Sequence, residues 1–200
     1  MKVTTEYHLG GKYDVIVCGG GPSGVAAVVS SARNGAKTLL VEQGGCLGGF
    51  WTRGLLTWLI DTFDKGALLD EVMERLEKNA DGKKFLYHTF ISGAVAEQRK
   101  VKSILTESKS GHVYFEASVF IDATGDGDPP YQIPLRALIS VDLDNLMMAG
   151  RCISGDFAAH ASYRVGGPAF RTGEVAGSCA AYCAKNEILP KDAVGVMPLP

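Results

Sequence analysis

The residues most suited to chemistry lie near the N-terminus, where three glycines, Gly19 to Gly21, directly follow an apolar stretch. The spacing Gly19-x-Gly21-x-x-Gly24 has a mechanical reason at each position. The first glycine permits a tight turn, the second lets the backbone approach a pyrophosphate, and the third lets a helix pack closely on the preceding strand. The N-terminus of that helix offers N–H groups and a positive dipole end to phosphate oxygens. The spacing therefore predicts a phosphate-binding loop.

The elements needed to position this loop are present on both sides of it. Residues 13–18 are rich in Val and Ile, as expected of a strand buried on both faces. Residues 23–34 are mostly small and predict a helix that ends at Gly35. A second apolar strand over residues 37–41 leads into Glu42, whose carboxylate can accept hydrogen bonds from ribose hydroxyls. This unit predicts a dinucleotide site and by itself suits either NAD or FAD.

The segment after Glu42 favours FAD. A second glycine pair, Gly48 and Gly49, follows the acid closely and predicts another approach of backbone to the ligand. An amphipathic helix is expected over residues 68–77. A simple NAD domain would continue with alternating strands and helices, and this chain does not.

Short strands follow that helix instead. One is expected over residues 85–90, and two more form a hairpin around Gly111, giving a small antiparallel meander at about residues 97–118. A separate buried strand, beginning at Ser118, is expected to return to the main sheet and end in the Ala-Thr-Gly triplet at 123–125. This order of strands is not typical of NAD-dependent dehydrogenases.

Taken together, these stretches resemble the FAD-dependent oxidoreductase family of the glutathione-reductase-like (Rossmann) flavoprotein superfamily. The resemblance is carried by DVIVCGGGPSGVAA, LLVEQGGCLGGFWT, SVFIDATGDGD and NLMMAGRCISGDFAAHASYRVGGPAFRTGEVAGSCAA, in this order. It implies an α/β fold in which a Rossmann-like, FAD-binding parallel sheet is flanked by helices and carries the small antiparallel meander. Residues 1–200 are expected to form a single FAD-binding domain. The implied function is FAD-dependent oxidoreduction, with FAD as the cofactor and the flavin carrying the electrons.

The resemblance also implies which residues hold FAD. The glycine loop would bind the pyrophosphate, Glu42 the adenosine ribose, and the second glycine pair would lie along the ribityl and flavin side. The implied cofactor-binding residues are Gly19, Gly21, Pro22, Ser23, Gly24, Glu42, Gln43, Gly48, Gly49, Val95, Thr124, Gly125, Gly150, Arg151, Gly166 and Gly167. Among these, Val95 would offer its backbone to the adenine, and Gly150 and Arg151 would reach the ribityl-phosphate part.

Candidate catalytic residues are few. His160 and Arg164 lie in the stretch AAHASYRVGG, which the resemblance places near the flavin, so they are the best candidates, although a loop or FAD-contact role suits them better. His8 is expected in an N-terminal tail and His112 in a strand, and neither is expected to take part in the chemistry. No Ser-His-Asp set and no metal-ligand spacing is present, so no metal is expected.

The chain departs from the family pattern after Asp128. In relatives, the Ala-Thr-Gly strand leads into a long substrate-binding domain, whereas here Pro129 and Pro130 lead directly to Tyr131. The substrate domain is therefore predicted to be excised at residues 128–131. The alternative function is then a minimal or engineered FAD-binding module with no substrate chemistry of its own. A homodimer or a partner subunit would cover the flavin.

Composition limits the remaining possibilities. The formal net charge is −2, and no Lys/Arg run indicates a nucleic-acid partner. No apolar stretch reaches the ~20 residues that cross a bilayer, and the N-terminus lacks the apolar core of a signal peptide. The five cysteines lack C-x-x-C spacing. These features predict a cytoplasmic protein that does not interact with membranes.

Overall fold

The computed structural model describes residues 6–56, 66–75, 85–86, 89–122, 133–164 and 166–198. Its strands are β1 (His8–Cys18), β2 (Thr38–Val41), β3 (Phe85–Leu86), β4 (Phe90–Glu97), β5 (Lys100–Ser108), β6 (Gly111–Asp122) and β7 (Leu146–Met148). Its α-helices are α1 (Pro22–Arg33), α2 (Ala67–Arg75), α3 (Phe157–Tyr163) and α4 (Gly166–Asn186). Short 3₁₀ turns are η1 (Gly49–Trp51), η2 (Leu135–Leu138), η3 (Gly150–Cys152) and η4 (Pro190–Ala193).

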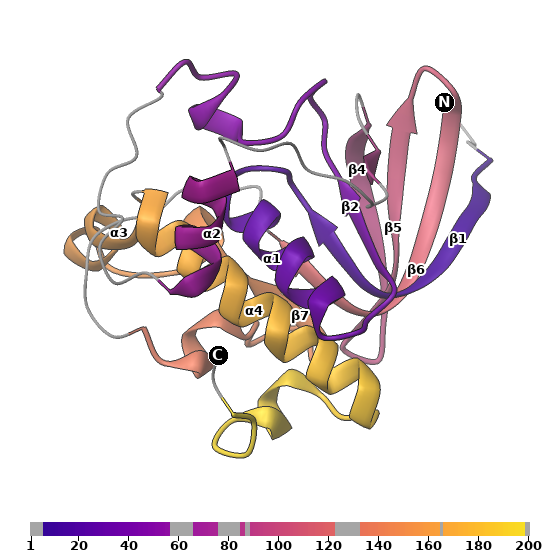
Figure 1. Cartoon of the computed structure of the whole chain (residues 1–200). Helices are drawn as coiled ribbons and strands as arrows, with labels where there is room; N and C mark the ends of the chain where they lie inside the picture. Colours follow the sequence, from indigo (N-terminus) through magenta and orange to yellow (C-terminus); the bar gives the residue numbers. More distant parts are fainter. Residues whose placement is uncertain are drawn as a thin grey trace.

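A seven-stranded sheet organises the chain, in the order β3-β2-β1-β6-β5-β4, with β7 also pairing with β6 (Figure 1). Strands β3, β2, β1, β6 and β7 are parallel where they pair, whereas β6-β5 and β5-β4 are antiparallel. The parallel part brings the carboxyl ends of β1 and β2 to one edge, because Cys18 pairs with Val41. The expected α/β fold with an antiparallel meander is confirmed.

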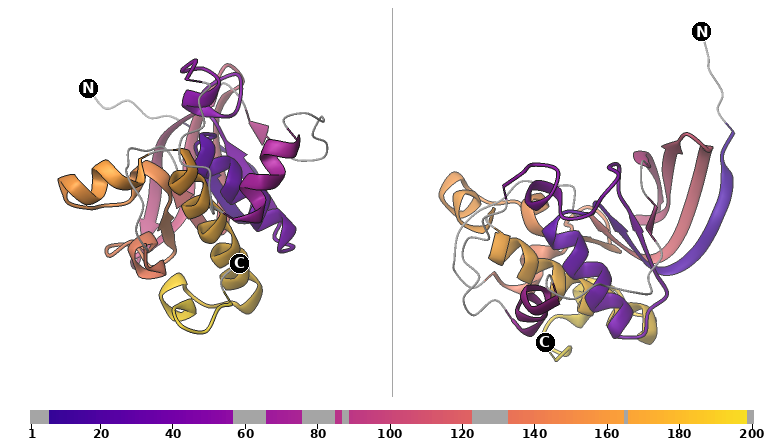
Figure 2. Two further views of the ribbon diagram at one scale, coloured as in Figure 1. Left: turned by 60° about the vertical axis from the view of Figure 1, so that its left-hand side comes forward. Right: turned by 45° about the horizontal axis from the view of Figure 1, so that its top comes forward.

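Alternate residues of β1 face two different hydrophobic clusters. Val15 and Val17 point to the side covered by α1 and α4. Ile16 and Cys18 point to the opposite side, where Val101 and other meander residues pack. The central strand is therefore buried on both faces, as its unbroken apolar sequence predicts. In Figure 2 the helices lie on one side of the parallel strands and the meander curves away on the other.

Helices α1 and α4 pack closely because small residues line their contact. A Cβ added at Gly177 would collide with the backbone carbonyl of Ala27, and one at Gly173 with that of Ser23. The hydroxyls of Ser30 and Ser178 lie 2.6 Å apart in the same contact. Each helix can approach the other only where these side chains are absent or small. The approach fixes the direction of α1, whose N-terminus faces the glycine loop.

One buried asparagine joins β7 to the meander. The Asn145 amide accepts from Val101 N at 2.6 Å and donates to Val101 O at 2.8 Å and to Ser118 O at 3.2 Å. The Asn145 side chain therefore makes the two hydrogen bonds with Val101, at the start of β5, that the backbone of a neighbouring strand would otherwise make. No local sequence pattern marks this residue.

Two expectations about strands were wrong. The stretches 112–117 and 118–122 form one continuous strand, β6, whose first part pairs with β5 and whose last part pairs with β7. His8 is not in a tail, since it begins β1 and pairs with Val113. The polar residues Glu116 and Ser118 do not break β6, because β1 continues alongside it. Residues 76–77, the end of the expected helix, lie outside the described ranges.

Candidate functional site

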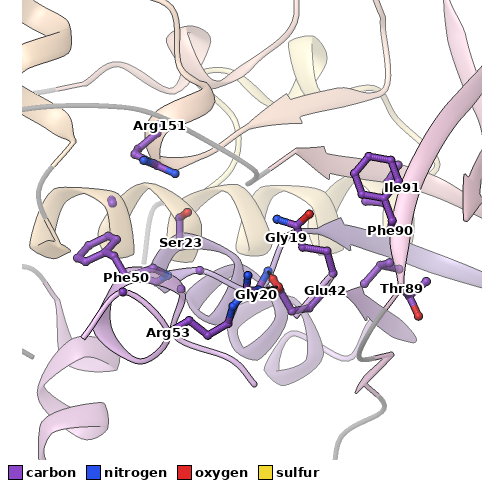
Figure 3. Close-up of a pocket in the computed structure, with 17 residues that line it drawn as sticks. Gly19, Gly20, Ser23, Glu42, Phe50, Arg53, Thr89, Phe90, Ile91 and Arg151 are labelled. Atoms are coloured by element: carbon purple, nitrogen blue, oxygen red, sulfur yellow. Dashed lines mark hydrogen bonds and ion pairs between the residues drawn. The ribbon is translucent and has the colours of Figure 1, made fainter. Parts of the chain in front are cut away.

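A cavity of about 660 Å³ lies where β1 and β2 end and α1 begins (Figure 3). The first glycine loop, the segment after β2, the start of β4 and the residue after Gly150 all contribute to it. Its lining residues are Gly19, Gly20, Gly21, Pro22, Ser23, Val41, Glu42, Gln43, Gly49, Phe50, Arg53, Gly54, Thr89, Phe90, Ile91, Arg151 and Ala169. Parallel α/β sheets commonly bind ligands at this position, beyond the carboxyl ends of the strands.

The glycine loop presents backbone to the cavity. Gly19 has φ of 98°, which favours glycine, and its N–H donates to the carbonyl of Val41 at 2.8 Å. Gly21 precedes α1 as its N-cap, and Pro22 begins the helix without a side-chain cap. A Cβ at Gly21 would meet no heavy atom within 4 Å, so this face of the loop is open. The first-turn N–H groups of α1 therefore remain suited to phosphate oxygens.

The second glycine pair lies directly against the first loop. Gly48 has φ of 98°, and its N–H donates to the carbonyl of Gly20 at 2.8 Å. Gly49 has φ of 52°, and a Cβ there would lie 3.1 Å from the Cα of Gly21. The two glycine-rich stretches thus form one continuous backbone surface, although a strand and a helix separate them in sequence.

Glu42 is the buried acid of the cavity, with 8% of its surface exposed. Its Oε2 accepts from Gly20 N at 2.6 Å, and its Oε1 accepts from Gly44 N at 2.6 Å. Arg53 Nη1 donates to the same Oε1 at 3.0 Å. The carboxylate therefore ties together the loop after β1, the loop after β2 and the turn after η1.

The opposite wall comes from the segment after β7. Gly150, with φ of 63°, donates its N–H to Thr172 Oγ1 at 2.9 Å and packs against Ser23. Arg151 follows and lines the cavity; in Figure 3 it lies across from Ser23, near the start of α1. A guanidinium here adds positive charge where the helix N-terminus is already electropositive.

The remaining wall is the start of β4. Thr89, Phe90 and Ile91 line the cavity, and Thr89 N donates to the backbone carbonyl of Glu42 at 3.1 Å. The Phe90 side chain is 56% exposed. Val95 lies further along β4, 40% exposed, and is not among the lining residues.

Other predicted site residues are not brought to the cavity. His160 lies in the last turn of α3, where its ring contacts the Tyr163 ring edge-on at 5.6 Å. Arg164 caps the end of α3 and is exposed, and neither residue lines the cavity. Gly166 and Gly167 begin α4 as buried residues and do not line it either.

The remaining predicted site residues either lie near the cavity without lining it or fall outside the described ranges. Gly24 is buried in the first turn of α1, and Gly48 lies beside the lining residue Gly49. Thr124, Gly125 and the proposed junction at 128–131 lie outside the described ranges. Within those ranges, no cluster of His, Cys, Asp and Glu side chains could hold a metal ion, and no helix is both long and apolar enough to span a bilayer.

Several lining residues, among them Arg53 and Phe90, were not predicted from the sequence. Arg53 stands outside every glycine motif and has no local pattern that marks it. Phe90 ends the strand expected over residues 85–90, and that position was the available signal. The cavity thus contains one carboxylate and two guanidinium groups from Glu42, Arg53 and Arg151.

A glycine loop at a helix N-terminus, with an acid after the next parallel strand, defines a dinucleotide-binding protein of Rossmann-like fold. Comparison with known families gives a narrower result. The family described as "FAD dependent oxidoreductase" matches residues 14–85, 67–129 and 127–197. The chain belongs to this family, and FAD is its cofactor.

Individual relatives match over short stretches. Dihydrolipoyl dehydrogenase of Trypanosoma brucei brucei is 54% identical over 37 residues, or 18% of this chain and 8% of that enzyme. Digeranylgeranylglycerophospholipid reductase of Methanocaldococcus jannaschii is 61% identical over 31 residues, or 16% of this chain and 8% of the relative. The chain therefore matches only a small part of the length of these enzymes.

Solved structures resemble the chain over most of its length. Thermovibrio ammonificans THI4 has a TM-score of 0.62 at 16% identity, covering 86% of this chain and 90% of that one. A geranylgeranyl bacteriochlorophyll reductase-like protein of Thermoplasma acidophilum has a TM-score of 0.53 at 14% identity, covering 88% and 79%. At these identities the similarity establishes a shared fold.

Proposed function

We propose that this chain is an FAD-dependent oxidoreductase whose FAD occupies the cavity lined by the two glycine stretches. The observation that carries the proposal is that four features suited to FAD lie at the same cavity. The open face of the first glycine loop, the second glycine pair, the buried Glu42 and the guanidinium of Arg151 all meet at one cavity. The first glycine loop suits a diphosphate, and the second glycine pair lets the protein backbone approach the ligand closely. Glu42 suits a ribose, and the guanidinium of Arg151 suits a negative charge. When bound, the flavin would supply the electron or hydride transfer.

The chain's own residues would bind and orient the cofactor. The first-turn N–H groups of α1 and the side chain of Arg151 would hold the diphosphate, because both present positive charge to the same region. Glu42 would accept from the adenosine ribose, and Gly48 and Gly49 would lie along the ribityl part. The expectations for Thr124 and Gly125, which follow β6 in the sequence, remain part of this proposal.

We place the adenine against the first residues of β4, where the sequence reasoning placed it against Val95. Phe90 offers a half-exposed aromatic ring beside the cavity, and Thr89 and Ile91 contribute to the same wall. An aromatic ring can stack on a purine, whereas Val95 lies too far along the strand to line the cavity.

A second candidate function is an FAD-binding module without substrate chemistry of its own. One observation favours it: within the described residues, the cavity lining contains no His, Cys or Lys that could act as an acid or base toward a substrate. His160 and Arg164 lie elsewhere. A partner subunit or a second copy of the chain would then complete the reactive site, as proposed for a domain that lacks its substrate region.

The remaining parts of the proposal rest on the sequence. The Asp-Pro-Pro-Tyr junction at 128–131 supports the loss of a substrate domain from a single FAD-binding domain. Assignment to the glutathione-reductase-like superfamily is supported by the short, strong match to dihydrolipoyl dehydrogenase, a match confined to 37 residues. A cytoplasmic location also remains part of this proposal, and the formal net charge of −2 is its support.

The test is direct. The purified full chain should be yellow, or should become yellow when reconstituted with FAD, and denaturation should release FAD rather than FMN. Anaerobic titration with dithionite, NADH and NADPH then separates the two candidates. Reduction by a nicotinamide supports an oxidoreductase with its own electron donor, whereas reduction by dithionite alone supports the module. A chain that does not bind FAD at micromolar concentration would contradict both.

A further inference from the structure

Glu42 has little hydrogen-bonding capacity left for a ribose. A carboxylate offers about four acceptor sites, and three donors already occupy this one: Gly20 N, Gly44 N and Arg53 Nη1. Two ribose hydroxyls need two sites, so at least one present donor must leave when a nucleotide binds. This argument rests on the proposed FAD site, in which Glu42 faces the adenosine ribose.

Arg53 is the donor that can leave. Gly20 and Gly44 donate from the backbone, and Gly20 is further held by the bond from Gly48 N to its carbonyl at 2.8 Å. The Arg53 side chain is 48% exposed and belongs to a turn that can release its guanidinium without moving backbone. An ion pair this exposed contributes little stability, so its exchange costs little.

The absence of a side chain at Gly44 leaves the space that the Arg53 guanidinium occupies. A Cβ at Gly44 would collide with the Arg53 guanidinium, so this guanidinium lies close against a glycine backbone. The turn that carries it is held by Thr52 Oγ1, which donates to the Leu47 carbonyl at 2.5 Å, and by Gly54 N, which donates to the Gly49 carbonyl at 3.2 Å. The guanidinium is thus directed into the cavity.

The diphosphate-binding surface lies close to this guanidinium. Arg53 Nη1 and Gly20 N donate to the two oxygens of one carboxylate, so the arginine lies one carboxylate away from the glycine loop (Figure 3). A diphosphate on that loop carries two negative charges, and Arg151 supplies one cation on the opposite wall. A released Arg53 would supply the second.

We propose that Arg53 is an exchangeable cofactor-binding residue: its guanidinium, which pairs with Glu42 Oε1, moves to the FAD diphosphate when ribose hydroxyls occupy Glu42. When paired with Glu42, the guanidinium neutralises a buried acid. When FAD is bound, its charge would face the phosphates, where a bidentate guanidinium bond is strong.

The test compares a ligand that has phosphates with one that does not. ADP and adenosine are titrated against the full-length apoprotein by calorimetry or by displacement of FAD, using wild type, Arg53→Gln and Arg53→Lys. Arg136→Gln is the matched control, because it removes an exposed arginine that does not line the cavity. Circular dichroism and thermal melting of each apoprotein confirm that it is folded.

We expect Arg53→Gln to weaken ADP and FAD by roughly ten- to a hundredfold, the range for losing one charge-assisted hydrogen bond. For Arg53→Gln, a plot of log Kd of ADP against log salt concentration should have a shallower slope than for wild type, because one cation no longer contacts phosphate. Adenosine should bind equally well or more tightly, because Glu42 is no longer occupied by Arg53. Arg53→Lys should fall between the two, and Arg136→Gln should match wild type.

Three results would overturn the inference. If Arg53→Gln weakens the binding of ADP and adenosine equally, Arg53 only holds Glu42 in place. If it tightens the binding of both ligands, Arg53 only competes with the ribose for Glu42. Unchanged affinity for both, with an unchanged salt dependence, would make it a surface ion pair. If wild-type protein binds neither FAD nor ADP, the proposed function itself fails, which is a different outcome from any of these.

Discussion

Glu42→Gln tests whether one carboxylate both organises the cavity and binds the ribose. A glutamine keeps one oxygen and replaces the other with an NH₂ group. In its better orientation the oxygen faces Gly44 N and Arg53, and the NH₂ group then faces Gly20 N, a second donor, where an acceptor stood at 2.6 Å. The reverse orientation leaves two donors unpaired. The substitution therefore removes at least one buried hydrogen bond even before any ligand is present.

The magnitude follows from that count. One buried donor without an acceptor costs about 1–3 kcal/mol of folding free energy. For a chain of this length each kcal/mol lowers the melting temperature by roughly 2–4 °C, so the apoprotein should melt about 2–12 °C lower. The lost acceptor for a ribose hydroxyl should weaken FAD by about 1.5–3 kcal/mol, which is roughly ten- to 150-fold in Kd.

The assay needs both quantities and a control that separates them. Thermal melting of the apoprotein gives the stability, and FAD fluorescence titration gives the Kd. Glu174→Gln is the matched control, because Glu174 is also 8% exposed and also pairs with an arginine, Arg171 Nη1 at 2.6 Å, outside the cavity lining. It should lose stability and keep its FAD affinity. A Glu42→Gln protein that melts lower while binding FAD as wild type does would refute the ribose role.

Three further outcomes are expected. Asn145→Ala removes three hydrogen bonds at 2.6, 2.8 and 3.2 Å and leaves backbone groups of β5 unpaired, so unfolding in urea should show a loss of about 2–4 kcal/mol, against less than about 1 kcal/mol for the exposed Asn186→Ala. Gly177→Ala forces a methyl group against the carbonyl backbone of α1 and should cost about 1–3 kcal/mol in the same assay; wild-type stability would contradict the close helix contact. A thiol reagent at neutral pH should label exposed Cys46 rapidly and Cys179 only on unfolding, because hydrogen bonding to its neighbouring thiol and burial raise the pKa of Cys179.

Much of the candidate cofactor site could be predicted because its determinants are local. Gly19, Gly21 and Glu42 stand at fixed distances along a strand, a turn, a helix and the next strand, and each distance is set by backbone geometry. The hairpin at Gly111 was equally predictable, because glycine readily adopts the positive φ that such turns require. In the structure Gly111 has φ of 102° and begins β6 directly after a two-residue turn.

Other features depend on contacts that no local pattern encodes. The sequence predicts two strands that meet at Ser118, yet β1 pairs with β6 from Val113 to Asp122 and keeps it continuous. The pairing of β4 with β5 shifts between Ile91 and Gly93 and again after Val95, so the sequence alone does not show which residues of β4 line the cavity. Val95 as the adenine contact is implied by the family resemblance and stays a prediction, whereas the β4 residues in the cavity lining are Phe90 and Ile91.

Arg53 was missed for a different reason, which concerns what a glycine-rich site leaves for side chains to do. Glycine loops present amides but carry no charge of their own, so the charge that complements a diphosphate must come from side chains outside the motif. Such a side chain needs only length and a free path, and many sequence positions can supply it. Here the path exists because Gly44 has no Cβ and Glu42 holds the guanidinium at the cavity wall. The glycine pattern therefore predicts where a phosphate binds, whereas the cations that determine how tightly it binds are visible only once the chain is folded.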